Sequence, residues 1–163
     1  MDEGGGDYSV VDLWVDGKRL VDMVREYETP LARAELYEDC DGDIEEDDIL
    51  YLAGKHQGLP MEEFLPPARH FFGEAISPQY YLFGVYKYAD KLPLLDCTSG
   101  ILGSWPLLAR ITTDNEKVIW SDFEQFYRSP ENKNEHLRWN YDGFGSFVFE
   151  RKQYETAFLN PQL

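Results

Sequence analysis

A small-residue loop at positions 96–105 holds the side chain best suited to nucleophilic chemistry, the thiol of Cys97. A thiol beside a histidine base is the pair that thiol-dependent enzymes use. The histidines that could act as this base are His56, His70 and His136, and the sequence alone places none of them beside Cys97. A free buried cysteine is usually a small apolar residue. A thiol-dependent or hydrolytic enzyme is therefore the alternative hypothesis.

The same loop favours a tight turn over a metal site. A soft metal ion needs three or four Cys or His ligands, and this loop offers one thiol. Gly100 and Gly103 suit a tight turn, and the small side chains around them leave room for Trp105 to pack over it. The acids at positions 39, 41 and 43 alternate as in a calcium loop, but the glycine and the glutamate that such a loop requires are missing in either register. We expect no metal ion and no cofactor.

A second pair of chemically active side chains, Asp122 and Glu124, follows the strand expected at residues 117–121. Residues at i and i+2 share one face of a strand, so the two carboxylates could act together in acid–base catalysis. Exposed acids at a strand end are common, and Arg110 or Arg128 could pair with them. Contact with a basic partner is as good an interpretation of this pair as catalysis.

Negative charge is concentrated near the N-terminus of this chain, which has a net charge of −16 at pH 7. Residues 1–50 hold 17 acidic and four basic side chains, whereas residues 51–163 hold 14 and 11. This argues against nucleic-acid binding, because phosphates need cations. An acidic face instead accelerates association with a cationic surface. The residues expected to contact a basic partner are Asp39, Asp41, Asp43, Glu45, Glu46, Asp47 and Asp48, together with Asp122 and Glu124.

These features favour a non-enzymatic binding protein that acts by occlusion. Its most concrete form is an immunity or antitoxin-like inhibitor whose acidic N-terminal half covers the basic face of a nucleic-acid-directed toxin. Aromatic side chains beside the acids would anchor such a complex. A DNA mimic is a further alternative, and it needs carboxylates spread over an extended surface. Charge blocks also occur simply as solvated faces.

The elements that would position these residues begin with a strand at residues 8–15. Apolar residues at helical spacing then predict an amphipathic helix over 18–28, ending before Thr29-Pro30. A hairpin across Asp16-Gly17 competes with the start of that helix. Like charges repel one another along residues 35–48, which we expect to be a loop or mobile segment.

The rest of the chain has the pattern of an antiparallel sheet. Strands are expected at 79–88, 92–97, 104–113, 117–121 and 145–149, with a hairpin turn at Asp114-Asn115-Glu116 and a loop over 129–142. A final helix around Tyr154 and Phe158 ends at Asn160-Pro161. The order predicts one α+β domain over residues 1–163, with a mainly antiparallel sheet and two principal helices packed on it.

Several segments resemble a set of uncharacterised bacterial proteins. The resemblance covers about two thirds of the chain, outside the acidic segment. Those proteins carry a C-x-C-G-x-x-G-C-W-P loop, a W-S-D-F-E-Q strand end and a G-x-F-V-F-x-x-x-Q-Y-E terminus, which correspond here to residues 97–106, 120–125 and 145–155. The N-terminal V-D-L-x-V-D-G-x-R-L stretch also fits. Cys97 matches the first cysteine of the loop, but Ser99 and Ser104 replace the other two. The resemblance implies a shared fold and no particular reaction.

Compartment signals in the sequence are few. The longest apolar runs are too short to cross a membrane, and residues 1–6 have neither the basic nor the apolar region of a secretory signal. Cys40 and Cys97 are too few for a disulfide framework and are typical of free thiols in a reducing compartment. We expect a cytoplasmic protein with no membrane contact.

Overall fold

The fold is built on one antiparallel sheet. The computed structural model describes residues 9–64, 69–74 and 90–161. Within these ranges five strands pair in the order β4-β6-β7-β8-β9, each antiparallel to its neighbours. Their bounds are β4 His56–Gln57, β6 Leu92–Cys97, β7 Leu107–Thr113, β8 Lys117–Gln125 and β9 Phe147–Glu150. Two shorter antiparallel pairs join β1 (Val10–Val11) to β5 (Leu59–Pro60) and β2 (Trp14–Val15) to β3 (Lys18–Arg19).

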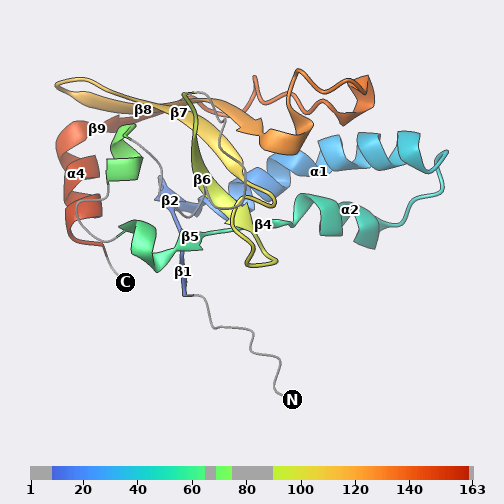
Figure 1. Cartoon of the computed structure of the whole chain (residues 1–163), viewed down its shortest axis with the longest axis horizontal. Helices are drawn as coiled ribbons and strands as arrows, with labels where there is room; N and C mark the ends of the chain where they lie inside the picture. Colours follow the sequence, from blue (N-terminus) through green and yellow to red (C-terminus); the bar gives the residue numbers. More distant parts are fainter. Residues whose placement is uncertain (1–8, 65–68, 75–89, 162–163) are drawn as a thin grey trace, which may run out of the picture.

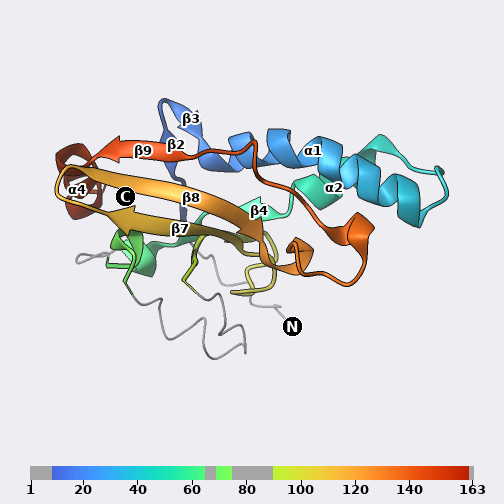
Figure 2. The same ribbon diagram turned by 90° about the horizontal axis from the view of Figure 1, so that it is seen from above.

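The described α-helices lie at opposite ends of this sheet. They are α1 (Leu20–Asp39), α2 (Glu46–Ala53) and α4 (Arg151–Leu159), and the short 3-10 helices are η1 (Met61–Phe64), η2 (Arg69–Phe72), η3 (Phe126–Arg128) and η4 (Glu135–Leu137). Figures 1 and 2 show α1 and α2 side by side, extending away from the sheet, with α4 at the other end. The predicted α+β class with a mainly antiparallel sheet is therefore confirmed, and α2 is a helix that was not expected.

The N-terminal region contains both the hairpin across Asp16-Gly17 and the helix that were competing predictions for it. Asp16 and Gly17 both have positive φ, +49° and +79°, which suits a two-residue turn between β2 and β3. The helix α1 begins directly after β3, at Leu20. The single strand expected over residues 8–15 is divided into β1 and β2, and residue 8 lies outside the described residues.

The helix predicted to end before Thr29-Pro30 is longer than expected. Pro30 lies inside α1, although it has no amide hydrogen to donate and costs about 3 kcal/mol relative to Ala in a helix interior. The buried face of α1 continues beyond it, with Ala32 and Glu35 both buried. We attribute the continuation to this buried face, because its packing and hydrogen bonds offset the cost of the proline.

The acidic segment 35–48 is helical at both ends, so its prediction as a loop is correct for residues 40–45 and wrong for the rest. Residues up to Asp39 belong to α1, and α2 begins at Glu46, which leaves only residues 40–45 as the connection. Three acids, Glu46, Asp47 and Asp48, occupy the first turn of α2. Negative side chains are favourable there because they face the positive end of the helix dipole.

The C-terminal elements follow the prediction closely. The turn at residues 114–116 joins β7 to β8, and α4 ends before Asn160. However, β7 starts at Leu107 rather than at 104, and β8 continues to Gln125, so Asp122 and Glu124 lie within a strand rather than after it. The strand expected at 79–88 lies outside the described residues.

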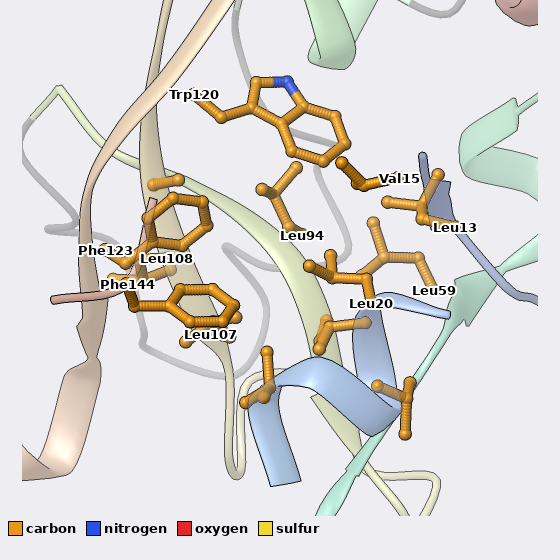
Figure 3. Close-up of a cluster of buried hydrophobic side chains, with 14 of the residues drawn as sticks. Leu13, Val15, Leu20, Leu59, Leu94, Leu107, Leu108, Trp120, Phe123 and Phe144 are labelled. Carbon is orange, nitrogen blue, oxygen red and sulfur yellow. The ribbon is translucent and has the colours of Figure 1, made fainter. Parts of the chain in front are cut away.

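The core forms where the sheet meets α1 and the N-terminal hairpin. Figure 3 shows side chains from β2, α1, β5, β6 and β8 meeting there, represented by Val15, Leu20, Leu59, Leu94 and Trp120. All five are nearly inaccessible to solvent. This core fixes the first turns of α1 on the sheet.

One candidate base, His70 of η2, is part of this interior. Its Nε2 atom lies 2.5 Å from the carbonyl oxygen of Pro93. Burial lowers the pKa of His70 to about 4, although the hydrogen bond to Pro93 acts in the opposite direction. His70 is therefore neutral near pH 7 and serves the structure of η2.

We predict that His70 makes the protein less stable in mild acid. The unfolded chain binds a proton near pH 6.5 and the folded chain does not until about pH 4, so the free energy of unfolding falls as the pH drops through this window. The expected loss between pH 7.5 and pH 5 is about 2 kcal/mol. Urea unfolding at both pH values measures it. A His70→Gln variant, which keeps a side-chain donor, should lose this part of the pH dependence; an unchanged dependence would contradict the assignment.

Candidate functional site

The acidic residues predicted to contact a partner gather at the far end of the α1–α2 pair. We call residues 39–48 the hairpin tip; it comprises the last residue of α1, the connection and the first turn of α2 (Figure 1). The connection is closed by backbone hydrogen bonds from Cys40 to Leu36 and from Gly42 to Tyr37, both 2.9 Å long. All seven predicted acids of the tip are exposed: Asp39, Asp41, Asp43, Glu45, Glu46, Asp47 and Asp48.

Ion pairs divide these seven carboxylates into two groups. Asp39 lies 2.6 Å from His136 of η4, and Glu46 forms a two-pronged pair with Arg33, with both contacts 3.0 Å long. The others have no ion pair with any residue in the described part of the chain: Asp41, Asp43, Glu45, Asp47 and Asp48. The unpaired acids therefore lie on the connection and on the first turn of α2.

Exposed apolar side chains accompany the tip on both helices. Tyr37 of α1 is 62% exposed, and Leu50 and Tyr51 of α2 are 47% and 73% exposed. Lys55 lies over the Tyr51 ring at 5.3 Å from its centre. Large tyrosine side chains beside charged groups are typical of protein-binding surfaces.

Two further carboxylates of α1, Glu28 and Glu35, face the interior instead. Glu35 accepts hydrogen bonds from the Arg128 guanidinium at 2.7 and 2.8 Å and from the Trp139 indole at 2.8 Å. Glu28 accepts one at 2.5 Å from the Tyr141 hydroxyl, and burial together with this carboxylate raises the pKa of Tyr141 well above its ordinary value. Figure 2 shows the segment that carries these donors running beside α1.

Glu28 and Glu35 were not among the residues predicted from the sequence to have a role. They lie one heptad apart, in phase with Leu20 and Val24 on the buried face of α1. This spacing was available in the sequence, but the helix was expected to end at residue 28, so Glu35 was assigned to a loop. A helix extended through Pro30 would have placed both acids on the apolar face.

Asp122 and Glu124 belong to a different surface. They line a cavity of about 470 Å³ whose lining includes none of residues 39–48. A bulge in β8, where Asp122 has φ +51°, breaks the strand alternation between Ser121 and Asp122 and leaves Asp122 and Glu124 on one face. Glu124 is paired with Lys91, and Asp122 with Arg110, which also pairs with Asp90. The two carboxylates therefore line the same cavity, as the spacing predicted, and each has a cation beside it.

The Cys97 loop is a closed turn. Gly100 and Gly103 have φ values of +75° and +77°, and the Asp96 carboxylate accepts hydrogen bonds from the amides of Cys97 and Gly103. Burial raises the pKa of the Cys97 thiol, but hydrogen bonds from Ser104 and Ser99 lower it by more, so the net shift is downward.

His56 is the predicted histidine that lies opposite Cys97. The two residues are direct partners between β4 and β6, and directly opposed residues of antiparallel strands project to the same face. The His56 Nε2 atom lies 2.8 Å from Glu28, while its buried Nδ1 atom has no hydrogen-bond partner among the described residues. The hydrogen bonds of Cys97 go to its own loop.

The described ranges contain neither a metal-ligand cluster nor a membrane-spanning helix. Residues 9–64, 69–74 and 90–161 contain no group of three or more His, Cys, Asp or Glu side chains placed to hold a metal ion. Over the same ranges, none of the helices combines the length and apolar character needed to cross a membrane.

We predict that Glu35 is essential to the stability of the α1–α2 pair. Replacing Glu35 with Gln leaves the mostly buried Arg128 cation without its counter-ion, which should lower the free energy of unfolding by about 3 kcal/mol. Urea unfolding measures this loss. The matched control is Glu38→Gln, an exposed acid on the same helix, which should change stability by less than about 0.5 kcal/mol. Equal losses in the two variants would show that the buried Glu35–Arg128 pair stabilises the fold no more than an exposed acid does.

Comparison with known proteins adds no assignment to this geometry. No protein-family model matches the chain, and neither the curated proteins nor the solved structures include a significant match to it. The resemblance drawn from the sequence motifs stays a prediction, and the functional proposal rests on the contacts and charges described above.

Proposed function

We propose that this chain is a cytoplasmic, non-enzymatic binding protein that occludes a basic protein partner with its hairpin tip. The observation that carries the proposal is the set of five exposed carboxylates at the tip that have no ion pair with any described residue. Unpaired carboxylates attract a cationic surface over a longer range than paired ones, since a paired acid is already partly neutralised. An immunity or antitoxin-like inhibitor of a nucleic-acid-directed toxin is the most concrete form of this function.

The exposed tyrosines near the tip supply the apolar contact area that a tight complex needs. Exposed ion pairs contribute little net affinity, so a tight complex needs apolar anchors that bury area. Tyr37 and Tyr51 stand on the two helices that lead to the tip, and both are more than half exposed. In the proposed complex the acids accelerate association and orient the partner, and the tyrosines slow its release.

The placement of the free acids favours occlusion over DNA mimicry. The five unpaired carboxylates lie within residues 41–48, at one end of the molecule (Figures 1 and 2). A mimic of the double helix needs negative charge repeated along an extended surface, because phosphates line both strands of DNA. A compact patch fits a local basic face better.

The proposal predicts that neutralising the tip abolishes capture of the partner. The tip variant carries Asn or Gln at all five unpaired positions: Asp41, Asp43, Glu45, Asp47 and Asp48. Its affinity should fall at least about tenfold, since attraction between opposite charges drives the encounter. The measurement is a pull-down from the native host, together with the products of neighbouring genes, at low and high salt, followed by a titration of any stoichiometric partner.

The matched control removes the same number of charges elsewhere. It carries Gln or Asn at five exposed acids outside the tip: Glu26, Glu116, Glu131, Glu135 and Asp142. A basic partner that is retained by the wild type and by this control, released by salt and lost from the tip variant supports occlusion. Equal retention by the tip variant, with circular dichroism showing a folded chain, would refute it.

A thiol-dependent enzyme remains the second candidate, because His56 lies opposite Cys97 and its buried Nδ1 atom has no hydrogen-bond partner in the described part of the chain. In that function His56 would take the thiol proton while Cys97 attacks an electrophilic carbon, and Glu28 would orient the imidazole. The geometry favours it less than binding, since no hydrogen bond joins the two side chains and the thiol is held by its own loop.

This second candidate predicts a thiol that stays reactive in mild acid. In a Cys40→Ser background, iodoacetamide should alkylate Cys97 faster at pH 6 in the folded chain than in the urea-unfolded chain, because a histidine partner stabilises the thiolate. His56→Gln should remove the advantage while circular dichroism shows a folded protein. A folded-chain rate that does not exceed the unfolded rate, or that is indifferent to His56, excludes the candidate.

A further inference from the structure

Among the described residues, β9 is an edge strand of the sheet. In the described part of the chain β9 pairs with β8 alone and ends the strand order. The ladder continues with a hydrogen bond of 2.8 Å from the Arg151 amide to the Glu116 carbonyl. Because hydrogen-bonded and non-hydrogen-bonded positions alternate along an antiparallel pair, Val148 and Glu150 direct their backbone groups away from β8. The Glu150 carbonyl begins the hydrogen-bonding of α4, since Glu150 is the N-cap of that helix. Among the described residues, the amide and carbonyl of Val148 and the amide of Glu150 are left to pair with another strand.

A groove of about 490 Å³ follows this edge, between β9, α4 and the β1–β2 segment. Its walls are mainly apolar and include Phe149, Tyr154 and Phe158. Two large apolar side chains at its mouth are strongly exposed, Trp14 at 60% and Val148 at 57%. Exposed apolar side chains that share a groove, with charged groups around them, commonly mark an interaction site.

The charged residues that line the groove all have one sign. They are Asp12, Asp16 and Glu150, and no Lys or Arg is among the described residues of the lining. Asp12 is paired with Arg19, and Glu150 caps α4 by accepting from the amides of residues 152 and 153. Asp16 has no ion pair with any described residue. Asp16 is therefore the carboxylate that remains to be matched by a cation.

This charge argues against a second copy of the chain as the occupant. Pairing β9 with itself would bring two acidic rims together in a protein that already carries a net charge of −16. Like charges across an interface cost several kcal/mol. An occupant with cationic side chains avoids this cost and complements Asp16.

We infer that the groove binds an extended, basic segment of a partner protein, which adds to the sheet as a strand beside β9. Its backbone pairs with the amide and carbonyl of Val148 and with the amide of Glu150, its apolar side chains fill the space between Trp14 and Val148, and its cations face Asp16. Strand addition of this kind obtains affinity from the main chain and specificity from alternate side chains. The inference is independent of the hairpin tip, which contributes no residue to the groove.

The probe is an acetylated, amidated and fluorescently labelled peptide of alternating Lys and Val, seven residues long, titrated into the full chain at physiological salt. Saturable binding by fluorescence anisotropy is expected. Trp14→Ala should weaken it about tenfold, because a large exposed aromatic is the principal anchor. Val148→Lys is a second variant. It places a positive charge beside the lysines of the peptide, and the repulsion should weaken binding about tenfold as well. The control is Ile101→Ala, an exposed apolar side chain outside the groove, which should leave affinity unchanged.

A separate variant tests whether binding of the peptide depends on the Asp16 charge. Asp16→Asn keeps a residue that tolerates positive φ and removes only the charge, so affinity should fall about threefold. Glu131→Gln, an exposed acid outside the groove, removes one charge elsewhere and should have no effect. A Glu-Val peptide of the same length should bind at least about tenfold more weakly.

Strand pairing is tested with two N-methylated peptides. Successive residues of a strand direct their amides to opposite edges, so methylation of all Val amides and methylation of all Lys amides block opposite edges. Loss of binding with one set and retention with the other is expected. Equal effects, no saturable binding, or affinity unchanged by Trp14→Ala would overturn the inference. Binding lost in the tip variant and kept in Trp14→Ala would assign the peptide to the hairpin tip and equally overturn it.

Discussion

Two buried carboxylates on α1 hold the architecture together. Glu28 and Glu35 accept hydrogen bonds from residues about a hundred positions later in the chain, and these bonds tie the helix to the segment that follows β8. A buried carboxylate without hydrogen-bond donors would severely destabilise the fold. We therefore expect α1 and the segment after β8 to become ordered together. The projection of α1 and α2 beyond the sheet depends on this contact, since Glu35 lies past the proline that would otherwise end the helix.

The acidic excess of the N-terminal region therefore has two physical roles. Some of its carboxylates act as internal acceptors, paired with Arg128 or with aromatic donors from the C-terminal half. Others are exposed at the hairpin tip and lack a partner in the described chain. Composition counts both kinds equally, so the charge imbalance read from the sequence overstates the charge that is available to a partner.

Local signals in the sequence were sufficient for much of the fold. The turn pair at residues 16–17, the β7–β8 hairpin and the end of α4 were all predicted, because each depends on a turn residue, an alternation or a proline nearby. The full length of α1 was not, since it depends on donors that are remote in the chain. The same limit applies to the candidate sites: the bulge at Asp122 and the pairing of His56 with Cys97 are properties of the assembled sheet.

The position of the tip has a consequence for how this protein can change. The side-chain contacts that secure α1 and α2 involve residues up to 39, Ile44 and residues from 46 onward, whereas the side chains at 41, 43 and 45 are exposed and bear no ion pair with described residues. Substitutions at 43 and 45 leave the core untouched, so binding preference can diverge there without loss of folding. Asp41 has φ +51°, which restricts that position to residues such as Asn or Gly. The connection between the two helices is thus a natural place to vary, or to graft, a short recognition sequence onto a stable scaffold.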